Sequence, residues 1–291
     1  MESVRPVIDQ KRCTSCGACV QACRFEVLKL RKGGAEARGI GTCIACGACV
    51  AVCPVGAVEH PLMPAERIVA LPAQAPVGYP ELLDLLRRRR SIRRYADEPV
   101  PEPVLHELVE AAILAPSAHN SQPWQFTFVT DAAVLAEIRD AYAQFFRALL
   151  AQAEREAGRE ELAAAHGESL PPLLDALGGA LHLLVRAHDR GDDRLLWGAP
   201  VLALVHSAPE APAAALSCTC AAANMMLAAT ALGLGSCIIG FLTIPMLIDP
   251  GFVSVLGLPQ SHRLHVGMAV GRPALRLRRS VVRREPPVTI I

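Results

Sequence analysis

The sequence has almost no net charge and very few lysines, and both shortages limit what the protein can do. Its 291 residues carry 29 basic and 28 acidic side chains, which leaves a formal charge of +1. Such a balance argues against a general surface for nucleic acid or another polyanion. The lysines are Lys11, Lys29 and Lys32, so arginine supplies nearly all the positive charge. The forked guanidinium group of arginine suits phosphate oxygens. The preference for arginine over lysine could equally reflect genome composition.

Other signals are missing as well. No G-x-G-x-x-G run follows a strand, so that kind of dinucleotide site is not indicated. Residues 1–10 contain acids and no apolar stretch, unlike a secretory signal, and we expect a cytoplasmic protein. Residues 221–242 lack charge and are long enough to span a bilayer. Their glycines, Asn224 and Thr230, and the absence of an aromatic belt, favour a buried helix or a dimer interface over a membrane span.

Cysteine, by contrast, is plentiful, with 11 residues in all. Two runs have the spacing C-x2-C-x2-C-x3-C, and Pro54 follows the second run. The flanks repeat too, since Gly17-Ala18 corresponds to Gly47-Ala48. Each residue of the second run lies 30 positions after its counterpart, which indicates an internal duplication. The two runs are Cys13, Cys16, Cys19 and Cys23, then Cys43, Cys46, Cys49 and Cys53.

This spacing suits two [4Fe–4S] clusters. Three thiolates separated by small residues can wrap one face of a cubane, and the fourth cysteine of each run reaches the other cluster. The expected ligand sets are Cys13, Cys16, Cys19 and Cys53 for the first cluster, and Cys43, Cys46, Cys49 and Cys23 for the second. Zinc is the alternative, but zinc sites usually carry paired C-x2-C ligands. Cys218, Cys220 and Cys237 are expected to be small buried residues.

On these motifs, residues 4–60 resemble the bacterial-type two-cluster ferredoxins. Arg24 follows Cys23, at a position where that family usually has proline. This difference removes none of the cysteine ligands. Residues 27–39 predict two short strands and a turn at Gly33-Gly34. Frequent prolines after His60 predict a stiff linker. The predicted organisation is therefore a ferredoxin-like domain over residues 1–60, a linker over 61–80 and a second domain over 81–291.

Two polar segments of the second domain could bind a cofactor. Residues 81–90 predict a short amphipathic helix that runs into RRSIRRY at 89–95, whose guanidinium groups and hydroxyl suit a phosphate. A helix over 104–114 leads to the loop PSAHNSQPW at 116–124 and a strand over 125–130. Asn120 and Gln122 can both donate and accept hydrogen bonds, as a flavin's pyrimidine edge requires. Taken singly, each segment could equally be an ordinary solvated turn.

Together these segments resemble the nitroreductase family over residues 80–285. LGLGSCIIGF at 232–241 and VGMAVGRP at 266–273 match as well, and residues 141–193 are helix-rich by pattern. The resemblance implies an α+β fold, with a mixed sheet flanked by helices, that binds FMN at a homodimer interface. It implies a central dimer helix over 214–232 and a C-terminal arm over 285–291 that reaches the other subunit. The implied FMN contacts are Arg89, Arg90, Ser91 and Arg93 at the phosphate and ribityl chain; Pro116, Ser117, Asn120 and Gln122 around the ring, partly from the partner; backbone amides near Ile238, Ile239 and Gly240; and Arg276 with Arg278, or Arg279 in place of one of them, at the phosphate.

The resulting hypothesis is an FMN-dependent, nitroreductase-like oxidoreductase. Electrons pass from two [4Fe–4S] clusters to FMN and on to an electron-poor small molecule, such as a nitroaromatic, a quinone or an activated double bond. Reduced ferredoxin or NAD(P)H is the expected donor, and the expected partner is a second copy of the chain rather than nucleic acid or membrane. FMN carries the chemistry, so no catalytic side chain is required, and His119 is the first to test as a proton donor. The alternatives are an electron-transfer relay between a carrier and a partner protein, and a sensor that has lost turnover.

Overall fold

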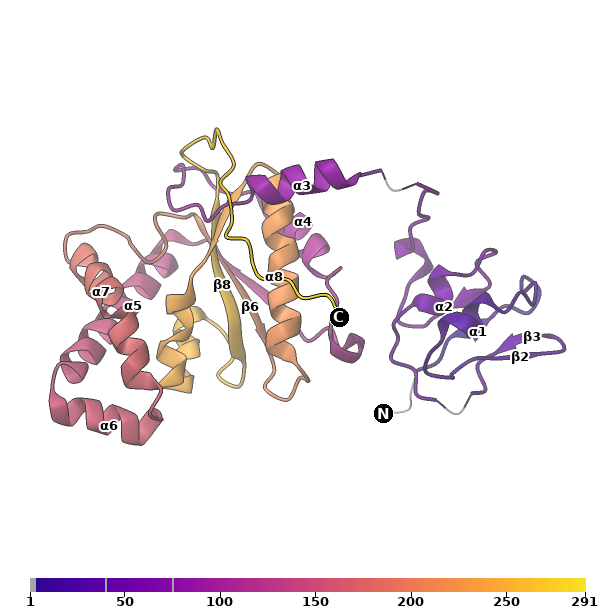
Figure 1. Ribbon diagram of the computed structural model, residues 1–291, viewed down its shortest axis with the longest axis horizontal. Coiled ribbons are helices and arrows are strands. Elements are labelled where there is room, and N and C mark those ends of the chain that lie inside the picture. The colour runs from indigo at the N-terminus through magenta and orange to yellow at the C-terminus, as the bar shows by residue number, and fades with distance from the viewer. Residues whose placement is uncertain (1–3, 40, 75) are drawn as a thin grey trace. The chain divides into compact units, whose positions relative to one another are not determined.

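The computed structural model describes residues 4–39, 41–74 and 76–291 (Figure 1). Residues 1–3, 40 and 75, which fall within the predicted N-terminal domain and linker, lie outside the described residues. The chain forms two compact units: one is Met1–Pro76 with Ala118–Ser121, and the other is Val77–Ser117 with Gln122–Ile291. The first break falls inside the predicted linker. Helix α3 (Tyr79–Arg88) begins within that linker, since Pro80 suits the first turn of a helix.

The N-terminal unit is built from short elements in a repeated order. Its strands form two antiparallel pairs, β1 with β4 and β2 with β3. The β2–β3 pair confirms the two short strands predicted between the cysteine runs. The elements of this unit are β1 (Val7–Ile8), α1 (Ala18–Ala22), β2 (Lys29–Arg31), β3 (Gly34–Glu36), α2 (Ala48–Ala51), β4 (Val58–Glu59), and the 3-10 helices η1 (Ala65–Arg67) and η2 (Ala118–Asn120).

The two cysteine loops share one backbone geometry. Gly17 and Gly47, directly before α1 and α2, have φ of 76° and 75°, in the left-handed region that glycine adopts without a steric penalty. Ser15 and Ala45, two positions earlier, are also left-handed, with φ of 57° and 51°. Non-glycine residues rarely adopt this conformation. The duplication therefore holds in the backbone, where each loop curls its cysteines around a common space.

The C-terminal unit is centred on a four-stranded sheet with the order β5-β6-β8-β7. All pairs of these strands are antiparallel, and Ser91 adds a parallel bridge to Ser236 at the β7 edge. The central strand β6 is buried at every residue, so both faces of the sheet are covered. The strands are β5 (Gln125–Val129), β6 (Val201–Ser207), β7 (Gly235–Ile238) and β8 (Arg263–Gly271).

Side chains of β6 alternate between two hydrophobic cores, as a pleated strand requires. Val201, Ala203 and Val205 pack with helices α4 and α8, whereas Leu202 and Leu204 pack with α5 and α7. Figure 1 shows α8 lying along the sheet beside β6 and β8. The remaining elements are α4 (Glu102–Ala112), α5 (Ala132–Ala153), α6 (Glu156–His166), α7 (Leu170–His188), α8 (Ala214–Ala231), η3 (Gly240–Thr243), η4 (Pro245–Leu247) and η5 (Pro250–Leu256).

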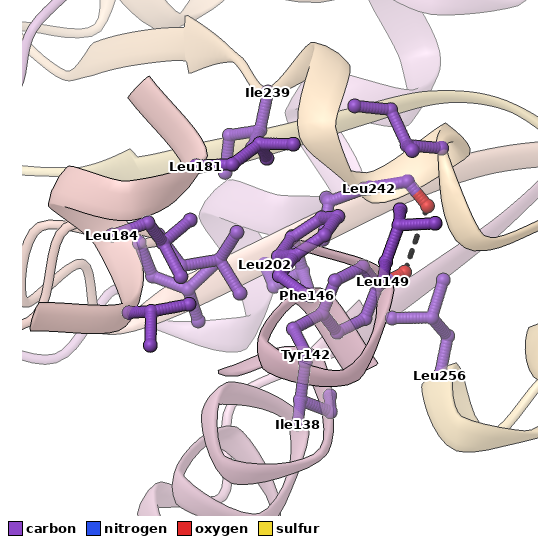
Figure 2. Packing of buried hydrophobic residues seen from close by; sticks show 14 of the residues in the cluster. Ile138, Tyr142, Phe146, Leu149, Leu181, Leu184, Leu202, Ile239, Leu242 and Leu256 are labelled. Carbon is purple, nitrogen blue, oxygen red and sulfur yellow. Dashed lines mark hydrogen bonds between the residues drawn. The ribbon is translucent and has the colours of Figure 1, made fainter. Parts of the chain in front are cut away.

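The core under α5 contains one polar anchor. Tyr142 is fully buried, and its hydroxyl donates a 2.7 Å hydrogen bond to the carbonyl of Leu242 (Figure 2). Phe146, one turn further along α5, lies with its ring centroid 5.9 Å from that of Tyr142. Because a buried hydroxyl needs a partner, this bond fixes the turn that begins at Gly240 against α5.

Helix α8 is, among the described residues, the one helix long and apolar enough to cross a membrane by length and composition. In that helix 39% of the residues are buried inside the unit, where they pack against α4, β6 and β8. Burial against α4 and the sheet accounts for part of its apolar character. The rest of the helix surface is uncovered in a single chain, including Leu216, which is 68% exposed.

Candidate cofactor sites

Each cysteine run lines a pocket in the N-terminal unit, and each pocket draws its fourth cysteine from the other run. The first pocket is lined by Cys13, Cys16, Cys19 and Cys53, with Gly17 and Ala18 between them. The second is lined by Cys43, Cys46, Cys49 and Cys23, with Gly47 and Ala48 in the matching places. This grouping is the one that the crossed ligand assignment requires. All eight side chains are free cysteines.

The thiols in each pocket influence one another. Burial, with added repulsion from Cys23, Cys43 and Cys46, raises the pKa of Cys49 to about 11. Burial likewise raises the pKa of Cys19, and Cys53 and Cys13 add to that effect. Thiolates crowded in this way are stable only beside a strong positive charge, which bound iron provides.

The pKa of Cys53 shifts in the opposite direction from those of Cys19 and Cys49. Burial acts to raise its pKa, but backbone N–H groups, led by that of Ala57, outweigh it and the pKa is lowered. The amide of Ala57 donates to Cys53 Sγ at 3.1 Å. Among the described residues, no three His, Cys, Asp or Glu side chains stand close enough together to hold a single metal ion. The second pocket has a volume of about 220 Å³ and the first only about 10 Å³, so the match to a cubane rests on the four thiol donors that each pocket supplies.

The arginine loop at residues 89–95 packs along the β7 edge of the C-terminal unit. The amide of Ile92 donates to the carbonyl of Ser236 at 3.1 Å. Tyr95 donates its hydroxyl to the carbonyls of Ile92, at 2.8 Å, and Ala269, at 3.2 Å. Backbone bonds from Ala96 to Arg272 and from Ala274 to Arg94 tie the loop to the chain after β8. Three of the four segments predicted to bind FMN therefore lie together.

An arginine-lined pocket of about 510 Å³ opens where these segments meet. Arg90 and Arg276 line it, together with Arg88, which the sequence analysis did not single out. Arg88 also lines a neighbouring pocket of about 290 Å³, with Arg87, Asp84, Arg278 and Arg279. The run of four arginines at 87–90 was the available signal, since α3 ends inside it. The basic side chains suit a phosphate by geometry and charge.

β7 contributes a polar atom that has no partner. Ser236 is 3% exposed, and its Oγ is the buried side-chain N or O atom that lacks a hydrogen bond among the described residues. Buried polar atoms are rarely left unpaired, so an orphan beside the arginine loop indicates room for a ligand. Burial raises the pKa of the neighbouring Cys237 thiol, against the effect of Arg93, Ser91 and Arg89, which lower it.

Residues 238–240, whose amides are predicted to approach the flavin ring, differ in exposure and in hydrogen bonding. Ile238 is 44% exposed at the end of β7, and Gly240 has open space where a side chain would be. Ile239, however, is 2% exposed and donates its amide to the carbonyl of Gly267 at 2.8 Å. That amide is committed to the sheet, so it is not free for a flavin ring. Arg93 lies over the ring of Trp197, 5.2 Å from its centroid, which adds a side chain that the sequence analysis missed.

Within the C-terminal unit, the two ends of the loop before β5 lie far from the arginine pocket. Strands β6 and β8 separate β5 from β7, a lateral distance of about 14 Å for three strand spacings. β5 also begins opposite His206, at the far end of β6 from the Arg272 side of β8. Ser117 accepts a 3.0 Å hydrogen bond from the amide of Gln122. Pro116, Ser117 and Gln122 are therefore not brought to the arginine loop of their own chain.

This loop has a strained backbone. His119, Asn120 and Gln122 have φ of 52°, 53° and 44°. Left-handed residues other than glycine cost energy and cluster at functional sites. Asn120 lies in η2, which groups with the N-terminal unit, and its contact with a flavin stays a prediction.

The fold and the two kinds of site define an iron–sulfur protein of the FMN oxidoreductase class. Residues 86–272 match the model of the nitroreductase family. This match covers more than half of the chain, which therefore belongs to the nitroreductase family. Residues 12–58 match the model of a 4Fe-4S dicluster domain. Both resemblances inferred from the sequence are confirmed.

Solved structures agree with the family assignment. A nitroreductase with bound FMN from Bacteroides fragilis is 27% identical, with a TM-score of 0.52, and the match covers 72% of this chain and 98% of that one. Oxidised iodotyrosine deiodinase bound to FMN and 3-iodo-L-tyrosine is also 27% identical, with a TM-score of 0.50 over 72% of this chain and 97% of that one.

Curated relatives match over shorter segments. An NADH dehydrogenase from Thermus thermophilus is 54% identical over 54 residues, which are 19% of this chain and 26% of that protein. Iodotyrosine deiodinase 1 from Rattus norvegicus is 42% identical over 60 residues, or 21% of each chain. The chain thus aligns with about a quarter of the length of these relatives.

Proposed function

We propose that the protein is an iron–sulfur flavoprotein oxidoreductase that transfers electrons from two [4Fe–4S] clusters to FMN and then to an electron-poor small molecule. The observation that carries the proposal is the presence, in one chain, of two four-cysteine pockets and an arginine pocket beside β7. Bound clusters supply one-electron transfer, and bound FMN supplies the exchange between one-electron and two-electron steps. The chain's own residues bind, orient and shield these groups.

Phosphate binding falls to the arginines. Arg88, Arg90 and Arg276 line the larger basic pocket, and Arg278 lines the neighbouring one. The same loop also contains Arg89, Ser91 and Arg93. These residues lie close enough to Cys237 to act to lower the pKa of its thiol. Ser236 Oγ, which lacks a partner, is available as a further donor. The ring would extend from this pocket along β7 toward Ile238 and Gly240.

A second copy of the chain completes the site in this proposal. Pro116, Ser117 and Gln122 lie across the sheet from the arginine loop of their own chain, so their predicted contacts with the ring would come from the partner. The uncovered side of α8, with Leu216 exposed, fits the predicted central dimer helix. The tail after β8 is exposed and lacks regular structure, as the predicted C-terminal arm would be before it meets another subunit.

The acceptor is proposed by chemical class. Nitroaromatics, quinones and activated double bonds all accept a hydride, or two electrons with protons, from a reduced flavin. Reduced ferredoxin or NAD(P)H is the proposed donor. Eleven free cysteines in one chain suit a reducing compartment such as the cytoplasm.

Anaerobic cofactor analysis followed by reduction tests the proposal. Purified protein should contain about eight iron and eight sulfide per chain, as two cubanes require, together with FMN. Reduced ferredoxin, NADH and NADPH are then compared by flavin bleaching, and nitrobenzene and a benzoquinone by reoxidation. Colourless, zinc-loaded protein contradicts the proposal. Reoxidation by a protein partner alone, with no small acceptor active, would replace the enzyme with an electron-transfer relay.

A further inference from the structure

His60 is a buried histidine beside one of the cysteine pockets, and neither the cluster motif nor the flavin motif accounts for it. It directly follows β4 and is 4% exposed. Its Nε2 lies 3.6 Å from Sγ of Cys43, a predicted ligand of the second cluster, and the ring lines that pocket. A buried imidazole normally has both nitrogens satisfied, so the partner of Nδ1 determines what Nε2 can do.

The backbone assigns the proton. The amide of Leu62 donates to Nδ1 of His60 at 3.2 Å, so Nδ1 is the acceptor nitrogen. A neutral imidazole then carries its hydrogen on Nε2. That hydrogen faces the sulfur, and His60 therefore donates to Cys43. A tight turn, in which the amide of Met63 donates to the carbonyl of His60 at 2.8 Å, fixes this geometry.

The internal duplication supplies a comparison within the same chain. The residue 30 positions before His60 is Leu30, which is 48% exposed and has no donor to offer. Backbone N–H groups also reach the sulfurs of both pockets: Ala57 donates to Cys53 at 3.1 Å, and Ala45 donates to Cys43 at 3.4 Å. The hydrogen bond from His60 is a side-chain contact of the second pocket that Leu30, at the equivalent position of the first repeat, does not offer to the first.

We propose that His60 is a positioning residue that raises the reduction potential of the cluster held by Cys43, Cys46, Cys49 and Cys23. A hydrogen bond to a ligand sulfur stabilises the more negative, reduced form of a cluster, and such bonds set cluster potentials. His60 thereby biases a single electron, shared between the two sites, toward the second. The inference rests on the cluster binding proposed above and goes beyond it by making the two clusters unequal.

Redox titration of the full-length protein, followed by electron paramagnetic resonance, tests the inference. His60→Leu places at position 60 the side chain that the first repeat has at the equivalent position. One of the two midpoint potentials should fall and the other should stay unchanged. His60→Gln keeps an N–H donor and should restore part of the shift. His106→Leu is the control, because His106 is an exposed residue of α4 whose Nε2 lies 3.6 Å from a carboxylate oxygen of Glu102; both potentials should stay the same.

A second measurement needs no substitution. Protein labelled with 15N-histidine should show a nitrogen hyperfine coupling to one reduced cluster, and His60→Gln should remove it. Assays of iron and sulfide measure the cluster content of the same protein independently of the hyperfine coupling. If the clusters are absent, the proposed function fails. If both are present but no histidine nitrogen couples to either, or if both potentials are unchanged in a fully loaded His60→Leu protein, the role of His60 is overturned.

Discussion

At the scale of single residues, His206 shows how burial controls charge in the C-terminal unit. It is 3% exposed near the end of β6, and both ring nitrogens have partners. Thr127 Oγ1 lies 3.0 Å from Nε2, and His262 Nδ1 lies 2.8 Å from Nδ1. Burial, with smaller contributions from His262 and His265, lowers the pKa of His206 to about 4. The folded protein thus keeps this imidazole neutral.

The stability of the protein should therefore depend on pH between about 4 and 6.5. In that range the unfolded chain binds a proton at His206 and the folded chain does not, so the free energy of unfolding falls as pH falls through this window. The loss is at most about 3 kcal/mol from this group. Urea unfolding at several pH values, compared between the unsubstituted protein and His206→Gln, measures it. The difference between the two proteins cancels the contributions of the other titrating groups. If the free energy of unfolding depends on pH equally in both proteins, the lowered pKa of His206 is contradicted.

A second residue-scale prediction concerns the arginine loop. Arg89→Ala combined with Arg93→Ala removes two guanidinium groups from the predicted phosphate site. Charge-assisted contacts contribute about 1.5–3 kcal/mol each, so the Kd for FMN should rise at least about a hundredfold. Equilibrium dialysis of the purified protein against FMN gives the value. Arg190→Ala, at an exposed position after α7, removes one arginine outside the loop and should leave the Kd unchanged. Unaltered FMN retention in the double variant would count against the phosphate assignment.

At the scale of elements, the approach of the arginine loop to β7 depends on one glycine. A Cβ on Gly235 would lie 2.6 Å from Cγ1 of Ile92 and 2.8 Å from its Cβ. The side chain of Ile92 is branched at that point and cannot swing away freely. Gly235 thus lets the loop come close enough for the hydrogen bond from Ile92 to Ser236.

Gly235→Ala should push the loop off β7 and weaken FMN binding without unfolding the sheet. We expect at least a tenfold increase in the Kd for FMN, which corresponds to about 1.4 kcal/mol, and a small change in the thermal midpoint of the flavin-free protein. Gly178→Ala is the control. Gly178 lies inside α7 with nothing within 4 Å of the added Cβ, so alanine there should stabilise the helix by about 0.5–1 kcal/mol and leave FMN binding as it was. Equal FMN binding in both variants would show that the loop tolerates displacement.

The sequence predicts several helices and strands well, because their patterns are local. The helix predicted over 104–114 is α4 (Glu102–Ala112), and the strand predicted over 125–130 is β5 (Gln125–Val129). β6 (Val201–Ser207) is absent from the predictions because it is buried on both faces, so its apolar residues do not alternate with polar ones. The strand order also depends on pairings between distant segments, which no local pattern encodes.

The same reasoning explains what the sequence reveals of the sites. The cysteine spacing is local and strong, and the structure groups the eight residues into the two sets expected from it. Ser236 becomes visible only through packing, because its unpaired hydroxyl depends on what lies beside it in space. Arg88 belongs to the arginine run at 87–90, but only the structure shows that it lines the basic pocket. Ile239 lies in a segment predicted to contact FMN, but its amide donates a hydrogen bond to the carbonyl of Gly267. In the sequence, His60 is simply the last residue of the predicted N-terminal domain, and only the structure shows that it lies beside Cys43.

At the scale of the whole molecule, each unit has its own core. Cys19, Leu28, Ala35 and Val58 form a small cluster in the N-terminal unit, and the sheet of the C-terminal unit is covered by two larger ones. The small core leaves the N-terminal unit with little apolar burial, and domains of this size usually need a metal or another cross-link for stability. The clusters are therefore expected to hold this unit together, whereas the C-terminal unit has enough core to fold without them.

Cys16→Ala tests that asymmetry. Cys16 is an exposed residue that lines the first pocket, so its loss should remove one cluster, about four iron per chain, and lower the stability of the N-terminal unit. FMN content and the thermal unfolding of the C-terminal unit should not change, because no residue of its cores is altered. Cys220→Ala, at a partly buried cysteine of α8 outside both runs, should keep all the iron. Iron assay, flavin absorbance and calorimetry on the same samples separate the outcomes. Simultaneous loss of FMN in Cys16→Ala would mean that the two units fold as one, and retention of all the iron would remove Cys16 from the ligand set.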